Sequence, residues 1–281
     1  MGSSGMYMKK ENYMRAYLEI CKKSFQERMA YRGELLIRFV GIFMSFYLLY
    51  MFWKALYANS TDVQGISFHS MITYTIMSAI MGGIINIFGI LNVYLAYWMS
   101  SRVRTGEIVM DMMKPTDFQL YLFSHSFGRL LFNVIVSVPI FILAIFIFKI
   151  YLPDSLGVLA LFAVSLSMSY LLTFLIDFMV SLVSFWTTQN QGVGGFTRLI
   201  IALLSGSFIP LWFFPDWARN VLSYFPFASI YHVPLSIYIG KIKSIEGLYA
   251  ISLQIIWIGV LFAGSRLLWL KSRRKLMTHG G

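Results

Sequence analysis

Residues 130–152, LLFNVIVSVPIFILAIFIFKIYL, decide the fold class of this chain. The stretch has 23 residues, and Lys149 is the single charged one among them. A helix needs roughly 20 apolar residues to cross a hydrocarbon core of about 30 Å. The stretch therefore predicts a membrane-spanning helix.

Five further stretches have the same character on either side of it. The chain has 58% hydrophobic and 12% charged residues, whereas soluble domains have roughly 25% charged residues. We therefore predict an all-α integral membrane protein with six transmembrane helices in one domain, residues 9–275. Residues 1–8 are expected to be a tag or a disordered start, and 276–281 a tail. The five further spans are predicted at about 39–57, 68–99, 156–186, 196–214 and 248–270.

The positive charges predict the orientation of these spans. Most of the 23 lysines and arginines lie in segments on the same side as the N-terminus, and such segments are usually cytosolic. We therefore expect both termini in the cytosol. The net charge of +11 is explained by these membrane-adjacent segments, so no nucleic-acid partner is expected.

Residues 12–36 are too charged to span a membrane. An apolar face recurs there at steps of three or four residues, at Met14, Leu18, Cys21, Phe25 and Met29. This periodicity predicts an amphipathic helix lying in the membrane interface. The alternative is a basic tail that only sets the topology. The basic residues expected at the membrane surface are Lys22, Lys23 and Arg28.

The segment before the last span is rich in proline and aromatic residues. Residues 216–222, after Pro215, predict a short amphipathic helix, and residues 230–239 predict a second apolar one. Because non-helical backbone at membrane depth must be buried in protein or line water, we expect an extracellular re-entrant pair that gates a path. An aromatic loop anchored in the outer interface is the alternative, and the two are compatible. The gate candidates are Pro210, Phe213, Phe214, Pro215 and Trp217.

The chain has no motif of an energy-coupling or catalytic site. It has no phosphate-binding loop, its four histidines lack metal-ligand spacing, and no Ser or Cys has a catalytic partner. We therefore expect no enzymatic activity, no metal and no cofactor in this chain. Asp177, within the fourth span, is a path candidate that would meet Asn86, Asn92 or a serine, or else a structural hydrogen-bonded residue.

The stretch RTGEIVMDMMKPTD, residues 104–117, is a charged interruption between two apolar regions. Gly106 and Pro115 predict the two ends of a short cytosolic helix, and Thr116 or Asp117 predicts the cap of the next one. Such a helix suits docking on a soluble partner, or it lies on the lipid surface as a connector. Its expected apolar face is Ile108, Val109, Met112 and Met113, with Glu107, Asp111 and Lys114 pointing elsewhere.

The GEIVMDMMKPTD loop and the stretch SGSFIPLWFFPDWARNVLSYFPFASIYHVPLSIYIGK, residues 205–241, resemble the membrane subunits of ABC-2-type ABC exporters. The resemblance covers residues 9–275 and is strongest to small permeases that work with a separate ATPase. It implies that residues 106–115 form the coupling helix on that ATPase, with Glu107 and Asp111 as polar contacts. It also implies ATP and Mg on the partner subunits and a second permease, identical or related. Localisation in a bacterial plasma membrane follows as an expectation.

Two other classes remain open from the sequence. A secondary, ion-coupled transporter without an ATPase needs coupling sites at mid-membrane and usually internal repeats, and Asp177 is the one candidate of this kind. A membrane-embedded enzyme or assembly protein needs convergent catalytic side chains. The substrate, whether lipid, peptide, drug or glycan, is left open.

Overall fold

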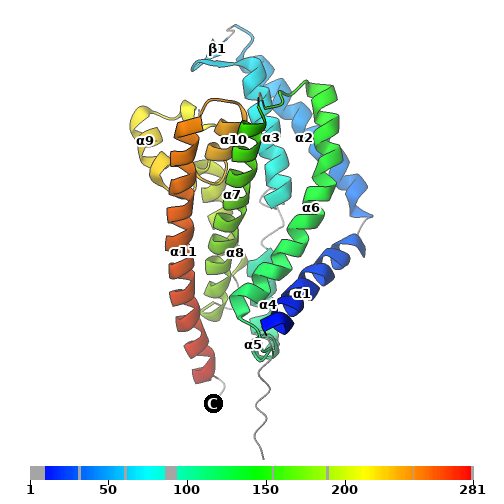
Figure 1. Cartoon of the computed structure of the whole chain (residues 1–281), viewed down its shortest axis with the longest axis vertical. Helices are drawn as coiled ribbons and strands as arrows, with labels where there is room; N and C mark the ends of the chain where they lie inside the picture. The colour runs from blue at the N-terminus through cyan, green and yellow to red at the C-terminus, as the bar shows by residue number, and fades with distance from the viewer. Residues whose placement is uncertain are drawn as a thin grey trace, which may run out of the picture.

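A computed structural model describes residues 10–30, 33–59, 62–85, 94–153, 155–187, 190–242 and 244–279. The described chain is a bundle of long helices with a two-stranded hairpin at one end (Figure 1). The predicted partner positions Asn86 and Asn92, and the predicted start 1–8, lie outside these residues. The elements are α1 Lys10–Ala30, α2 Glu34–Leu56, β1 Asp62–Val63, β2 Ile66–Ser67, α3 Phe68–Ile85, α4 Tyr94–Thr105, α5 Ile108–Met112, α6 Phe118–Phe148, α7 Leu156–Leu182, η1 Val183–Phe185, α8 Gln191–Leu204, η2 Leu211–Phe213, α9 Asp216–Tyr224, α10 His232–Tyr238 and α11 Ser244–His279.

Within the described ranges, five helices are long and apolar enough to cross a membrane. This finding confirms an all-α membrane protein with several spans. The five segments are Phe39–Leu56, Phe68–Ile85, Phe118–Phe148, Leu156–Phe185 and Ile245–Lys275. They overlap all the predicted spans except the fifth, and the second, predicted at 68–99, is a helix that ends at Ile85.

The predicted fifth span contains a helix that is shorter than expected. Helix α8 has 14 residues, or about 21 Å at 1.5 Å per residue. The chain leaves it at Gly206, whose φ of +80° is a conformation that glycine adopts readily. Two hydrogen bonds from α3 hold the following backbone: the Tyr74 hydroxyl donates to the Gly206 carbonyl at 2.8 Å and Ser78 Oγ to the Ser207 carbonyl at 2.9 Å.

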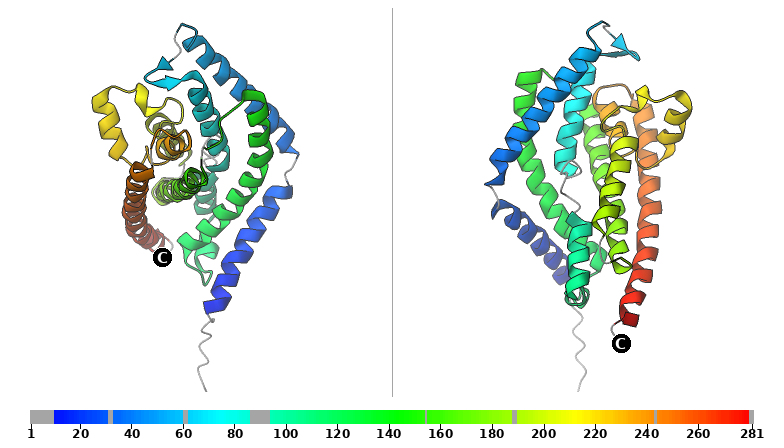
Figure 2. Two further views of the ribbon diagram at one scale, coloured as in Figure 1. Left: turned by 45° about the horizontal axis from the view of Figure 1, so that its top comes forward. Right: turned by 180° about the vertical axis from the view of Figure 1, so that it is seen from behind.

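Helix α6 begins well before the predicted span of residues 130–152. Its N-cap is Asp117, whose side chain accepts a hydrogen bond from the Leu120 backbone N–H, as the sequence predicted. The extra residues at its start include polar ones such as His125. They remain helical because α1 packs along them (Figures 1 and 2).

The α1–α6 contact divides the predicted apolar face of α1. The backbone carbonyl of Cys21 lies close to Gly128 of α6, and Phe25 packs edge-on to Phe132 of α6 with ring centroids 6.1 Å apart. Met14 and Leu18 are exposed, and so is Met29. Part of this face therefore packs on protein, which the periodicity alone did not predict.

The short helices after α8 differ in burial. Helix α10 lies among α3, α7 and α11 (Figure 2), and Leu235 within it has no exposed surface. The preceding segment is held by Gln254 of α11, whose side-chain amide donates to the Ser229 carbonyl at 2.7 Å. Helix α9 lies at the periphery with Trp217 and Tyr224 exposed. Both short helices were predicted, but only α10 is enclosed by other helices.

Candidate functional site

The loop between α4 and α6 has the local structure that its sequence predicts. Gly106 has a φ of +77°, which ends α4 and turns the chain into α5. Helix α5 ends at Met112, before Pro115, and Asp117 then caps α6. The loop lies at the end of the bundle opposite the β-hairpin (Figure 1).

The apolar face predicted for α5 is partly wrong. Ile108 is fully buried and belongs to a core cluster with Phe178 and Trp269. A five-residue helix has too few turns for periodicity to define its buried side, so the neighbouring helices decide it. Met112 is half-buried. The exposed apolar side chains, which we call the apolar triad, are Val109 (49% exposed), Met110 (70%) and Met113 (78%).

Asp111 is a buried carboxylate rather than an exposed contact of this loop. Its oxygens lie 2.6 Å from Lys114 Nζ and 3.2 Å from Arg102 Nη1. The same Arg102 atom lies 3.1 Å from Glu107 Oε2, and Glu107 remains exposed. Although burial lowers the pKa of Lys114, its hydrogen bonds to Asp111 and to the Tyr121 hydroxyl outweigh that effect and raise it overall. These ion pairs brace α5 against α4.

Asp117 joins three helices at the other end of the loop. Its carboxylate accepts a hydrogen bond from Arg266 Nη1 of α11 at 2.6 Å, and its backbone N–H donates to the Tyr17 hydroxyl of α1 at 3.0 Å. Partial burial tends to raise the pKa of Asp117, but the hydrogen bonds from Arg266 and the first turn of α6 lower it overall. Displacement of the loop would therefore reach α1, α6 and α11 together.

A polar groove of about 460 Å³ lies beside this loop, between α1, α4, α5 and α6. Lys23 and Glu27 of α1 line it opposite Arg102 and Lys114. Among the predicted membrane-surface residues, Lys22 and Lys23 are exposed and Arg28 is half-buried. The charged side chains of α1 and the loop thus form one surface.

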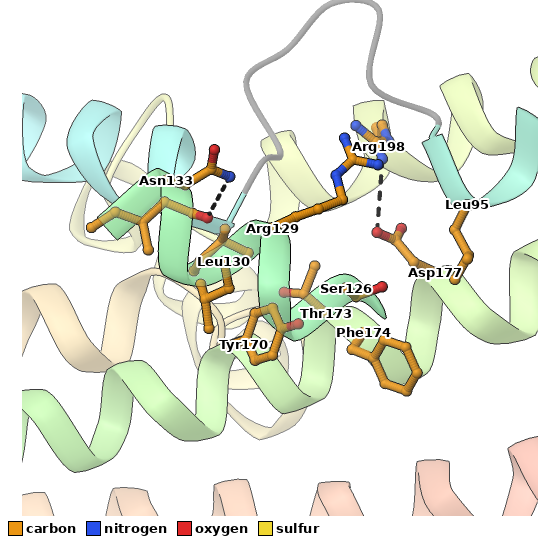
Figure 3. Close-up of a pocket in the computed structure, with 12 residues that line it drawn as sticks. Leu95, Ser126, Arg129, Leu130, Asn133, Tyr170, Thr173, Phe174, Asp177 and Arg198 are labelled. Carbon is orange, nitrogen blue, oxygen red and sulfur yellow. Dashed lines mark hydrogen bonds and ion pairs between the residues drawn. The ribbon is translucent and has the colours of Figure 1, made fainter. Parts of the chain in front are cut away.

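Asp177 lines a second polar feature deeper in the bundle. It lies 3.7 Å from Arg198 Nη2 of α8, and both line a cavity of about 60 Å³ with Arg129 and Tyr170 (Figure 3). Arg129 lies just before the predicted span 130–152 and Arg198 near the start of the predicted span 196–214, and neither was predicted to lie close to Asp177. The signal available was one acid and one base on consecutive apolar helices.

The gate candidates differ in burial. Pro210 is buried, and Phe213 is half-buried against Trp53 with ring centroids 5.5 Å apart. Phe214 is also half-buried. Pro215 and Trp217 are exposed. Across the described ranges, no group of three or more His, Cys, Asp or Glu side chains is placed to hold a metal ion.

Comparison with known proteins gives one match. A family model described as an ABC-2 family transporter protein matches residues 43–280. No curated protein and no solved structure shows significant similarity to the chain. The matched region includes both the α4–α6 loop and the Asp177 cavity.

Proposed function

Because the chain belongs to the ABC-2 family of transporter proteins, we propose that it is the membrane-spanning permease subunit of an ATP-driven exporter. Separate ATPase subunits, which carry ATP and Mg, power it, since the chain has no phosphate-binding loop of its own. A second permease, identical or related, completes the translocation path. The assembly lies in a bacterial plasma membrane.

The apolar triad carries this proposal. Val109, Met110 and Met113 project from a helix that is anchored by Ile108 in the core and by ion pairs to Asp111. Burying these partly exposed side chains against a partner stabilises the contact by about 1 kcal/mol each. Exposed apolar side chains on a rigid, charged loop suit docking into a groove of a soluble subunit.

The ion pairs and hydrogen bonds of Asp111 and Asp117 connect the segment around the triad to the long helices, so a force on this segment can reach them. Asp111 connects α5 to α4, and Asp117 connects the start of α6 to Arg266 of α11 and Tyr17 of α1. A push on α5 by the ATPase is therefore delivered to several long helices at once. In our proposal this tilts the helices and opens the path.

The proposal includes six crossings with both termini in the cytosol. Helix α8 and the backbone as far as Pro210 together make the fifth crossing. The hydrogen bonds from Tyr74 and Ser78 satisfy backbone carbonyls where the helix has ended, as membrane depth requires. Most lysines and arginines then lie on the cytosolic side.

The test uses the complex purified from its native host through a tag on this chain, with ATP hydrolysis as the readout. Replacing Val109, Met110 and Met113 together by Asp is expected to lower hydrolysis and ATPase co-purification at least tenfold. Val109→Asp alone is compared with Val221→Asp as its matched control, because Val221 of α9 is 52% exposed, close to Val109 at 49%. Undiminished hydrolysis in the triple variant would contradict the docking proposal.

A secondary, ion-coupled transporter is the second candidate, favoured by the Asp177–Arg198 pair within the bundle. Transport in vesicles separates the two functions. An exporter of the proposed kind stops when ATP is withheld and is indifferent to a collapsed proton gradient. The ion-coupled transporter shows the reverse dependence, and Asp177→Asn abolishes its coupling.

A further inference from the structure

Polar side chains form a stripe on each of the apolar helices α6 and α7. The two stripes are Ser126, Arg129 and Asn133 on α6 and Tyr170, Thr173 and Asp177 on α7. Within each stripe the residues are three and then four positions apart, which places them on one face of their helix. Both stripes line the cavity of about 60 Å³ that Figure 3 shows. We call the two facing stripes the polar seam.

Two buried oxygens in the polar seam make no hydrogen bond within the described part of the chain. They are Oδ1 of Asn133 and the hydroxyl oxygen of Tyr170. Asn133 is only 3% exposed, and its Nδ2 donates to the Ile84 carbonyl at 3.2 Å, so its oxygen alone is left over. A polar atom buried without a partner is costly, and most such atoms are satisfied by protein or by ordered water.

The charged members of the seam do not call for a ligand. Asp177 lies 3.7 Å from Arg198 Nη2, and Arg129 and Arg198 both have further interactions within the chain. The need is therefore confined to one amide oxygen, which requires a donor, and one hydroxyl group, which can donate or accept.

The chemistry of these two groups selects the ligand. A carboxylate or a phosphate group offers mainly acceptors, which an amide oxygen cannot bind. An ammonium group offers donors only, and it would lie in a cavity lined by two guanidinium groups and one carboxylate. A water molecule both donates and accepts. Because one water needs roughly 10 to 15 Å³ of such space, the cavity of about 60 Å³ has room for a few.

We propose that the polar seam holds a small cluster of ordered water molecules between α6 and α7. The cluster donates to Asn133 Oδ1 on α6 and accepts from the Tyr170 hydroxyl on α7. Because water molecules reorient, the seam tolerates small movements of α6 along α7 that a direct side-chain bond would oppose. The cluster is a property of the single chain and does not depend on the proposed function.

The first experiment labels side chains that lie next to internal water. The purified full chain in neutral detergent is irradiated with X-rays, which convert water into hydroxyl radicals, and oxidised residues are counted by mass spectrometry. Tyr74 is the matched reference, because it is also buried but its hydroxyl donates directly to the Gly206 carbonyl and it does not line this cavity. We expect Tyr170 to be oxidised at least about fivefold faster than Tyr74. Equal rates overturn the proposal.

The second experiment uses the sign of a stability change. Removing a buried hydroxyl that has no partner stabilises a protein, whereas removing one that is bonded destabilises it. We therefore expect Tyr170→Phe to lower the thermal unfolding midpoint by about 2 to 4 °C. Tyr74→Phe should lower it similarly, since it loses a direct bond. A midpoint of Tyr170→Phe that is unchanged or raised overturns the proposal.

The third experiment asks whether one cluster serves both helices. Asn133→Leu and Tyr170→Phe each remove a partner of the same water, so the double variant should lose less stability than the sum of the two single losses. Asn133→Leu combined with Tyr74→Phe is the control and should be additive, because Tyr74 bonds to Gly206 outside the seam. Additivity in both pairs overturns the shared cluster.

These measurements remain decisive where a variant fails to fold. The labelling experiment uses the unmodified chain, and Tyr170→Phe removes a single oxygen atom without changing the ring. The assays contain no ATPase and no ATP. Their failure therefore leaves the proposed function untouched, and failure of the triad experiment leaves the water cluster untouched.

Discussion

Gly128→Ala is expected to separate α1 from α6. A Cβ atom at Gly128 would lie 2.1 Å from the backbone carbonyl oxygen of Cys21, whereas ordinary contact begins at 3.4 Å. The two helices must therefore move apart locally by about 1.3 Å, the difference between these distances. A shift of that size also breaks the hydrogen bond from Ser24 Oγ to the His125 carbonyl, now 2.7 Å.

The magnitude follows from three opposing contributions. Overpacking costs about 1 to 3 kcal/mol, and the lost hydrogen bond about 1 kcal/mol. The better helix propensity of alanine returns up to about 1 kcal/mol. The net weakening of the α1–α6 contact is therefore about 2 kcal/mol, and α1 frays once it is undocked because single helices are marginal in water.

Hydrogen–deuterium exchange in lipid nanodiscs measures this weakening. We expect amides of α1 to exchange about thirtyfold faster in Gly128→Ala than in the unmodified chain. Gly259→Ala is the control, because Gly259 lies in α11 with no atom within 4 Å of its added Cβ. Unchanged exchange in α1 would refute the close approach of the two helices.

Three further variants test other contacts. Asp117→Ala removes the cap of α6 and the partner of Arg266 and should cost about 1 to 2 kcal/mol at neutral pH. Because the folded-state pKa of Asp117 lies below its ordinary 3.8, that stability is fully present well above pH 3.8 and is lost as pH falls through the lowered pKa. The difference in thermal unfolding between the variant and the unmodified chain should therefore be larger at pH 7 than at pH 3. Asp111→Ala leaves Lys114 without its buried acid and should speed limited proteolysis of the α4–α6 loop several-fold; an unchanged rate would exclude the bracing role. Gln254→Leu removes the donor at 2.7 Å from the Ser229 carbonyl, which keeps only the Ser169 hydroxyl at 3.1 Å, and it leaves the buried Ser165 hydroxyl without its side-chain acceptor. The thermal unfolding midpoint should therefore fall by an amount equivalent to about 1 to 3 kcal/mol, and an equal midpoint would contradict that assignment.

Hydropathy predicted the membrane class because long apolar runs have few other uses. It also placed most spans, but it missed the early start of α6. The residues from Phe118 to Arg129 include polar side chains, and their helix is stabilised by α1 packing rather than by lipid. A hydropathy window averages one segment of the sequence, so it contains no information on packing against another helix.

The ends of the helices around the α4–α6 loop were equally predictable from the sequence, whereas the buried and exposed faces of these helices were not. Gly106 and Asp117 act through backbone geometry and capping, which depend on near neighbours in the sequence. The burial of Ile108 and the exposure of Met110 depend on which side of α5 meets the bundle. In a membrane protein, apolar side chains face lipid and protein alike, so polarity does not distinguish the two.

Of the three charged residues that line the cavity, the sequence identified Asp177 but not Arg129 or Arg198. Asp177 was identified because an intramembrane carboxylate is costly. Its neighbours Arg129 and Arg198 were not predicted, because each lies close to the predicted end of a span. Their depth depends on where α6 and α8 begin, and helix boundaries are the least predictable part of a sequence.

The shortness of α8 has a consequence for the surrounding bilayer. Phe196, Leu199 and Leu203 are exposed along this helix, yet it is only about 21 Å long, roughly 9 Å less than the average hydrocarbon core. In the proposed six-span arrangement, the lipids beside this helical part of the fifth crossing compress to match it, at a cost of fractions of a kcal/mol for each ångström of mismatch. In that arrangement the bilayer is locally thinner beside α8, and thicker membranes favour any assembly that covers α8 with protein.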